Sequence, residues 1–290
     1  MSSNLMIHIL MPGVRFTYRV IVTSGQTTTP KFTFAAGAPA TNISWGDGSA
    51  LEAVTSGVEL THTYSIDGTY MVQLVGLQQG IYLTEIDIHS DRVIDAVTNI
   101  RKFSNLTSFN LNTNSAWVQD IQSWNLPSKL ITMNIYSTNV TGDIGQWVLP
   151  STLQTFYAMA CNGLYCDITS WVLPASLINF AIYSSLYIAG DISAWVLPAG
   201  LLIFQILGTL LTGCPILTSM VSIQSIFAQD THLIEASVDL WLSRCVAREA
   251  STTYATPTLN LGGNNSAPSA AGLIDKATLV GAGWIVTTNP

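Results

Sequence analysis

Four aspartates recur at nearly constant intervals and could do chemistry together. Asp120, Asp143, Asp167 and Asp191 are 23, 24 and 24 residues apart. A row of carboxylates could bind calcium, because hard cations prefer oxygen ligands. Each aspartate, however, opens a version of one phrase, Asp-Ile-x-x-Trp-x-Leu-Pro, and a column of identical residues is the usual by-product of a structural repeat. We therefore expect these side chains to hold turns, with calcium binding as the alternative.

A second candidate is Asp47 with His62, residue types that serve catalysis or metal binding. Neither has further partners at ligand spacing, so we expect satisfied structural polar groups. His8, His89 and His232 are scattered singly and predict no site. The sequence has no Gly-x-Ser-x-Gly elbow, phosphate-binding glycine loop or His-Glu-x-x-His motif. We predict a protein that is not an enzyme and that has no cofactor and no metal.

The repeated phrase requires a repeating element to position it. Its tryptophans have the same spacing: Trp124, Trp147, Trp171 and Trp195. A period in this range is typical of a solenoid. Between the tryptophans runs leucine-x-x-apolar-x-apolar-x-x-small polar, as in Leu177, Phe180, Ile182 and Ser185. This pattern resembles the leucine-rich repeat, in six regular turns and then more loosely, from Leu83 to the C-terminus.

The resemblance implies that each coil contributes one short strand, parallel to its neighbours at about 4.8 Å, with the Ile and Trp of the phrase filling the core on the return side. It also implies a buried ladder of small polar residues that bond to neighbouring backbone. The regular members of this ladder are Asn114, Thr138, Cys161, Ser185 and Thr209, with Asp91 before them and Thr231 and Asn264 after them.

The same register predicts which side chains leave the strands toward solvent. These positions form two uncharged, partly aromatic columns, and the candidate binding residues among them are Asn110, Asn134, Tyr136, Tyr157, Met159, Tyr183 and Gln205. Tyr and Met are favoured at recognition surfaces, and solenoids use such faces for binding. A face that packs on another subunit, or that is only solvated, is the alternative.

Residues 12–80 follow a different pattern. The segments from Arg15 and Lys31 alternate in the manner of half-buried strands, and they precede a Trp-Gly-Asp-Gly-Ser motif. That motif, with His-Thr-Tyr and Gly-Thr-Tyr further on, resembles a PKD-type immunoglobulin-like β-sandwich. The motif residues are Trp45, Gly46, Asp47, Gly48, His62, Tyr64, Gly68 and Tyr70. The resemblance implies a tight glycine turn and a Trp45 and a Tyr70 that pack between two sheets; residues 1–11 precede it as an arm.

The solenoid is expected over residues 81–235, and residues 236–290 read as its helix-containing cap. Val238, Trp241, Leu242 and Cys245 predict an amphipathic helix with Ser237 as N-cap. A strand from Thr258, a second helix capped by Ser269 and ending near Gly281 or Gly283, and a last strand after Trp284 follow. This tail resembles the closing module of leucine-rich-repeat proteins of bacteriophages and their hosts.

Composition limits the remaining possibilities. Only 9% of residues are charged and the net charge is −7, which argues against nucleic-acid binding. The segment 195–217 is apolar enough for a membrane span, but the repeat register explains it better. The first residues lack a basic region and do not predict a secretory signal. Four cysteines, Cys161, Cys166, Cys214 and Cys245, have no zinc-motif spacing and are expected to be free buried thiols.

Together these features predict a mainly β fold, with an N-terminal Ig-like sandwich, a leucine-rich-repeat solenoid of parallel strands and a helical cap. The function that they favour is a non-enzymatic bacteriophage virion protein, a tail, fibre or head-decoration component present in multiple copies on the particle surface. Its expected partners are other virion proteins and a host-surface glycan or protein, without membrane insertion. The alternative is an extracellular bacterial adhesin on the cell surface, which binds glycan or protein.

Overall fold

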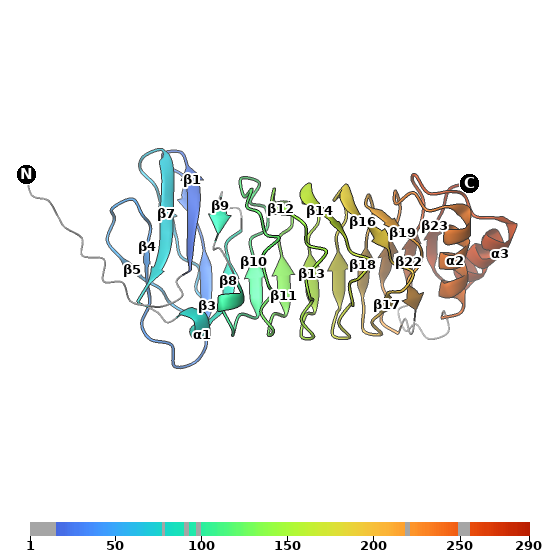
Figure 1. The fold of residues 1–290 in the computed structure, drawn as a ribbon, viewed down its shortest axis with the longest axis horizontal. Coiled ribbons are helices and arrows are strands. Elements are labelled where there is room, and N and C mark those ends of the chain that lie inside the picture. The colour runs from blue at the N-terminus through green and yellow to red at the C-terminus, as the bar shows by residue number, and fades with distance from the viewer. Residues whose placement is uncertain (1–15, 77–78, 90–92, 97–99, 218–220, 249–255) are drawn as a thin grey trace, which may run out of the picture.

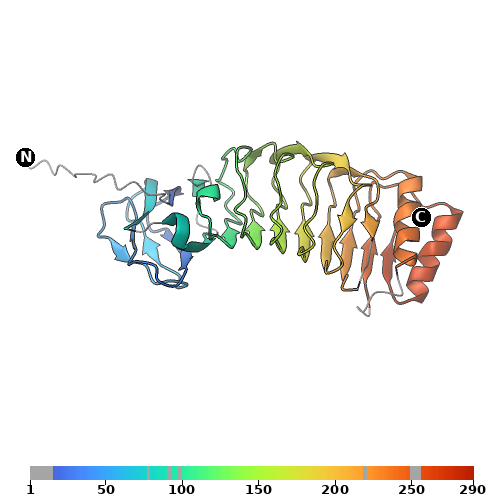
Figure 2. The same cartoon turned by 60° about the horizontal axis from the view of Figure 1, so that its bottom comes forward.

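The computed structural model describes residues 16–76, 79–89, 93–96, 100–217, 221–248 and 256–290. The expected arm, residues 1–11, and the expected ladder residue Asp91 lie outside these ranges. The described part is mainly β, and it is elongated, with β1 (Thr17–Val22) near one end and α3 (Ala270–Gly281) at the other (Figures 1 and 2).

The N-terminal part is built from short antiparallel strands. After β1 come β2 (Thr27–Thr28), β3 (Lys31–Phe34), β4 (Asn42–Ser44), β5 (Glu52–Ala53), β6 (His62–Thr63) and β7 (Gly68–Val75). One sheet has the order β5-β4-β7-β1-β9, where β9 is Val93–Ala96, and β2 pairs with β6. Residues of β1 alternate between exposed and buried, so the expected half-buried strand is confirmed.

A ten-stranded sheet runs along the rest of the molecule. Nine of its strands are parallel to one another: β8 (Leu83–Asp87), β10 (Ser108–Asn110), β11 (Thr132–Asn134), β13 (Thr155–Tyr157), β15 (Asn179–Ala181), β18 (Ile203–Gln205), β21 (Ser225–Phe227), β22 (Thr258–Asn260) and β23 (Ile285–Thr287). Each coil therefore adds one strand, and the register places Phe156 beside Phe180 and Phe180 beside Phe204, as the sequence pattern predicts.

The return side of the coils carries shorter pairings. A four-stranded sheet contains β12 (Thr141–Gly142), β14 (Gly163–Asp167), β16 (Tyr187–Asp191) and β19 (Leu210–Thr212), and β17 (Val196–Leu197) pairs with β20 (Ile216–Leu217). Two short helical turns, α1 (Gln79–Tyr82) and η1 (Ile100–Lys102), flank the first coil.

Aromatic rings form the centre of this core. Phe156, Phe180 and Phe204 stack at 5.8 and 5.6 Å between ring centroids. Trp171 meets Phe156 edge to face at 5.7 Å, and Trp195 meets Phe180 in the same way at 5.9 Å. All four repeat tryptophans are at most 5% exposed. The repeated phrase is thus a packing element, as expected.

The polar ladder is also present, with one correction. Asn114, Thr138, Cys161, Ser185, Thr209 and Thr231 are buried. Ser185 Oγ donates to the Ala158 carbonyl of the preceding coil, and Asn114 Nδ2 donates to Ile88. The prediction of Asn264 as a ladder residue was wrong. Asn264 is exposed and Asn265 is buried, because the turn after Leu261 contains one more residue, with Gly263 at φ +72°.

The repeat aspartates hold turns, as predicted. Each accepts a hydrogen bond from the backbone N–H two residues later, at 2.8 Å for Asp120, Asp143 and Asp167 and at 2.9 Å for Asp191. Gly142 and Gly190 lie against the carboxylates of the preceding coils, with φ of +115° and +140°, and a Cβ at either position would clash there. This explains why Gly recurs before Asp in the repeated phrase.

Strand pairing continues across the expected boundary near residue 81. β3 adds to the long sheet by antiparallel pairing with β8, while β9 returns to pair with β1. Phe16 of the N-terminal part also meets Phe103 at 6.0 Å. The N-terminal strands therefore cover the first coil and share its sheet and its core.

Two helices cover the other end. The first, α2 (Glu235–Val246), buries Val238, Trp241, Leu242 and Cys245, as predicted. Its N-cap is Ile234 and not Ser237, which lies in the first turn, because Asn265 Oδ1 holds the N–H of Leu233 and starts the helix earlier. The cap of α3 at Ser269 is confirmed by its bond from Gly272 N, and the helix ends at Gly281.

The apolar segment 195–217 contains β17, β18, β19 and β20. Leu201, Phe204 and Ile206 are buried in the coil interior, as the register predicts. Among the described residues, no helix has the length and apolar character that crossing a membrane requires.

Candidate recognition surface

The outward side of the ten-stranded sheet brings the predicted binding residues together. Its first column is set by strand register and runs Lys31, Asp87, Asn110, Asn134, Tyr157, Ala181 and Gln205. Its second column lies two residues further along each coil and runs His89, Asn112, Tyr136, Met159, Tyr183 and Leu207. We call these two columns the strand face. All seven residues predicted for binding lie on it.

The two columns stay in register beyond the strands. The N–H of Thr113 donates to the Tyr136 carbonyl at 2.7 Å, and the N–H of Ala160 donates to the Tyr183 carbonyl at 2.9 Å. Thr113, Ser137, Ala160 and Ser184 each adopt φ near +55°, a left-handed conformation that turns every coil at the same point. The face is therefore fixed by the backbone and repeats from coil to coil.

Aromatic side chains dominate the middle of the strand face. Tyr136, Tyr157, Met159 and Tyr183 are all half-buried. Burial raises the pKa of Tyr157, and the neighbouring Tyr183 raises it further. Ala181 pairs with Tyr157 and lies two residues before Tyr183, and it is only 1% exposed. These side chains are therefore partly covered by their neighbours and partly open to solvent.

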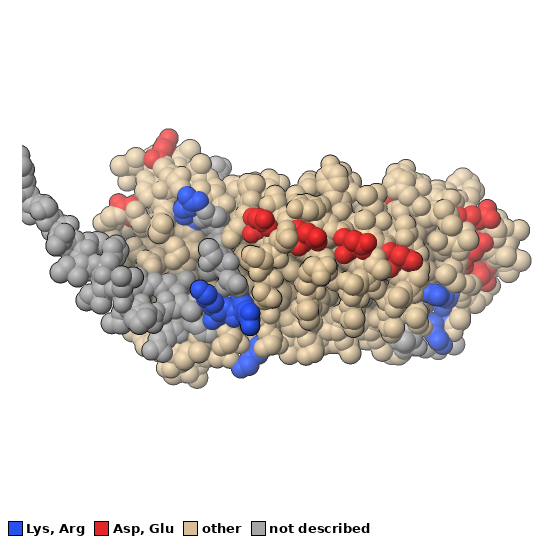
Figure 3. Space-filling view, viewed as in Figure 1, with Lys and Arg blue, Asp and Glu red and all other residues tan. Residues whose placement is uncertain are grey.

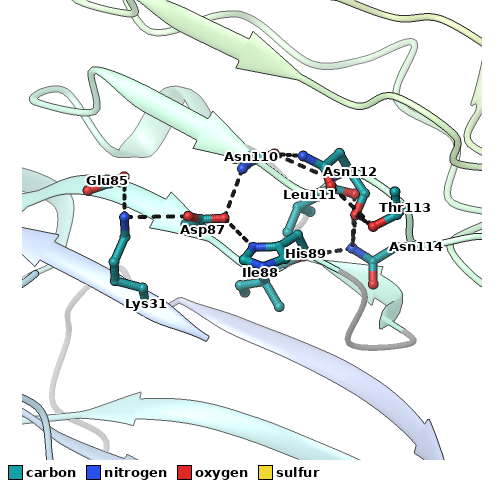
Figure 4. Close-up of polar contacts among 10 residues, drawn as sticks. All are labelled: Lys31, Glu85, Asp87, Ile88, His89, Asn110, Leu111, Asn112, Thr113 and Asn114. Carbon is teal, nitrogen blue, oxygen red and sulfur yellow. Dashed lines mark hydrogen bonds and ion pairs between the residues drawn. The ribbon is translucent and has the colours of Figure 1, made fainter. Parts of the chain in front are cut away.

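A polar network adjoins the aromatic part at the N-terminal end of the strand face (Figure 4). Lys31 Nζ lies 3.1 Å from Glu85 Oε1 and 3.4 Å from Asp87 Oδ2. Asn110 Nδ2 donates to Asp87 Oδ1 at 2.8 Å, and Asn112 Nδ2 donates to Asn110 Oδ1 at the same distance. Ion pairing with Glu85 is the main cause that raises the pKa of Lys31.

The network includes a histidine for which the sequence predicted no site. His89 Nδ1 lies 3.0 Å from Asp87 Oδ1, and its side chain is 43% exposed. The carboxylate accepts, so Nδ1 carries the proton and Nε2 of the neutral ring is an acceptor. Lys31, Glu85 and Asp87 were also missed, because their meeting depends on the pairing of β3 with β8. The alternating pattern from Lys31 predicted a strand, but it did not predict that this strand pairs with β8.

Asp47 and His62 do meet in the N-terminal part. His62 Nε2 lies 2.8 Å from Asp47 Oδ2. The His62 ring stacks on Trp45 at 4.6 Å and meets the edge of Tyr64 at 4.7 Å. Burial acts to raise the pKa of Asp47, but hydrogen bonds from Ser49 and His62 outweigh it and lower that pKa to about 2. The pair therefore locks an aromatic stack, which agrees with a structural role.

This aromatic stack continues through the remaining motif residues. Tyr64 stacks on Tyr70 at 4.6 Å, and Tyr70 Oη donates to the Ile66 carbonyl. Trp45 is buried, as expected, whereas Tyr70 is half-buried. Gly46 and Gly48 have φ of +82° and +87°, which confirms the expected glycine turn; Gly68 packs beneath the Tyr70 ring.

The repeat aspartates form a separate acidic row on the return side. Figure 3 shows acidic groups in line along the coils. Hydrogen bonds from Thr169 and Ser193 lower the pKa of Asp167 and Asp191, respectively. In the described part of the chain, no group of three or more His, Cys, Asp or Glu side chains could hold a metal ion. The geometry shown by these aspartates is that of turns.

The four cysteines are free and buried, as expected. Burial raises the pKa of Cys166 and of Cys214 to about 12 each, and it raises the pKa of Cys161 and Cys245 as well. Thiols of this kind are poor nucleophiles at neutral pH, because the thiolate is the reactive form.

Comparison of the chain with protein-family models, with curated proteins and with solved structures found no match.

Proposed function

We propose that the chain is a non-enzymatic structural protein of a bacteriophage particle, a tail, fibre or head-decoration component that acts in assembly or in host-surface attachment. In this proposal residues 12–80 form a PKD-like, immunoglobulin-like sandwich, residues 81–235 a leucine-rich-repeat solenoid and residues 236–290 its cap. The spacing of Trp124 to Trp195, the buried polar ladder and the Asp47–His62 stack support this reading.

One observation carries the functional part of the proposal. The strand face is a long, regular and nearly uncharged surface on an elongated molecule, built by six consecutive parallel strands, β8 to β18, with β3 at one edge. A surface of this kind suits repeated weak contacts with an extended partner. An enzyme would instead need a concave site with convergent reactive groups. Of the two Asp–His pairs described above, the histidine of Asp47–His62 is held in an aromatic stack, and Asp87–His89 lies on the strand face.

The proposal is tested on density-gradient fractions of the source material, analysed by mass spectrometry. We expect the chain to co-migrate with a major capsid protein at fixed stoichiometry, and copy number would then separate decoration from fibre. Recovery with the cell envelope or free in the medium, without any particle, would reject the virion proposal. That outcome would favour the bacterial adhesin, which the same strand face would serve.

A further inference from the structure

We propose that the strand face between Asp87 and Tyr183 binds a neutral oligosaccharide. This inference deepens the proposed function, on which it rests, by naming the chemical class of the attachment partner. Sugar rings present C–H faces and a rim of hydroxyl groups. The binding surface must therefore offer flat aromatic rings next to planar polar side chains.

The aromatic half of this requirement is met by three consecutive coils. Tyr136, Tyr157 and Tyr183 lie half-buried on neighbouring coils, and the strands of these coils are about 4.8 Å apart. A ring that lies flat presents the negative side of its π-system, which attracts the C–H bonds of a sugar. Tyr hydroxyl groups at the edges of the same rings can bond to the sugar hydroxyls.

The polar half adjoins it on the two preceding coils. Asp87 orients the Asn110 carboxamide, Asn110 orients Asn112, and Asp87 also fixes the tautomer of His89 (Figure 4). Groups held in this way lose little conformational entropy when a ligand binds. The Oδ1 atoms of both carboxamides accept within the network, but each Nδ2 carries a second hydrogen that can donate to a sugar hydroxyl.

Charge decides between neutral and charged ligands. Within the strand face as defined above, Lys31 is the sole Lys or Arg, and it is already paired with Glu85 and Asp87. Sulfated or sialylated glycans need uncommitted cations to offset desolvation, and this surface offers none among its own residues. A neutral glycan carries no such cost.

The limited exposure of its apolar side chains favours a glycan over a protein as the ligand of the strand face. Protein interfaces draw most of their affinity from large anchors that enter pockets. The large apolar side chains that are well exposed, such as Val148 and Val172 at 83% and 82%, lie on the return side of the coils, outside the strand face. A row of half-buried tyrosines and carboxamides instead suits a linear chain of sugar rings that runs from coil to coil.

The test uses the full chain on an array of immobilised neutral hexose and N-acetylhexosamine oligosaccharides, with sialylated and sulfated glycans alongside, followed by titration calorimetry with the best neutral binder. We expect neutral glycans to bind and Tyr157→Ala to weaken binding by about tenfold or more. Tyr157→Phe should retain most of the affinity, because it keeps the ring. Asn110→Ala should also weaken binding.

The matched control is Tyr187→Ala, which removes a tyrosine that is 61% exposed on the return side and should leave binding unchanged. All variants are first shown to have the wild-type circular dichroism spectrum. Absence of binding to every neutral glycan, binding of anionic glycans alone, or an equal loss in Tyr187→Ala would overturn the inference. Particle co-migration is measured separately, so a virion protein without glycan binding would refute only this inference, and glycan binding without a particle only the virion proposal.

Discussion

Replacement of Trp171 tests the packing of the return side most directly. Trp171 is 4% exposed and meets Phe156 edge to face, and its Nε1 donates to the Gly145 carbonyl at 3.2 Å. We expect Trp171→Ala to lower the free energy of unfolding by about 3–5 kcal/mol, the usual cost of such a cavity. Trp171→Phe should cost about 2 kcal/mol, because it keeps part of the packing but leaves the Gly145 carbonyl without its donor.

Trp147 provides the matched comparison. It is 5% exposed on the preceding coil, but its Nε1 has no hydrogen-bond partner among the described residues. Trp147→Phe removes a buried, unsatisfied donor, so it should cost about 1 kcal/mol less than Trp171→Phe. The assay is urea denaturation followed by far-UV circular dichroism, a signal that does not depend on the replaced indole. A change below about 1 kcal/mol for Trp171→Ala, or equal costs for the two Phe variants, would refute this account of the core.

Three further outcomes are expected. Ala160 has φ +54°, so Ala160→Gly should stabilise the protein by about 0.5–1 kcal/mol, the left-handed penalty less the extra chain entropy of glycine; a lowered melting temperature would contradict this. The folded pKa of Asp47, about 2, lies below its ordinary 3.8, so its ionised form stabilises the fold above about pH 4 and this contribution is lost as the pH falls toward 2. Melting temperatures across that range should fall less steeply for Asp47→Asn than for the wild type. If the melting temperatures of the two proteins fall in parallel, ionised Asp47 does not stabilise the fold through its contact with His62. The four thiols should resist an aromatic disulfide reagent at about pH 8 in the native state and react fully in denaturant; rapid reaction of Cys166 without denaturant would show that its coil opens.

The repeating part of the fold could be predicted from the sequence because the same pattern of apolar and small polar residues recurs in each coil. Phe156, Phe180 and Phe204 lie side by side because the same interval separates them in the chain. The shift from Asn264 to Asn265 escaped prediction, since one extra residue in a glycine turn leaves the apolar pattern unchanged.

Contacts between distant segments could not be predicted in this way. The pairing of β3 with β8 joins residues about 50 positions apart and has no periodic signal. The ion pairs of Lys31 depend on it, because Lys31 meets Glu85 and Asp87 only through that pairing. The tyrosine columns, by contrast, follow from the coil register alone.

The stacking of coils also determines how the molecule would respond to a pull along its length. Each strand bonds to the next along the long axis, so tension along that axis acts on all rows of hydrogen bonds at once, and the rows can rupture one coil at a time. A detached coil of 24 residues can extend to about 80 Å, where the folded coil occupied about 4.8 Å. A single local rupture would therefore lengthen the molecule many times more than elastic strain could. The tension would then relax, and the coils that remain folded would stay bound to a surface.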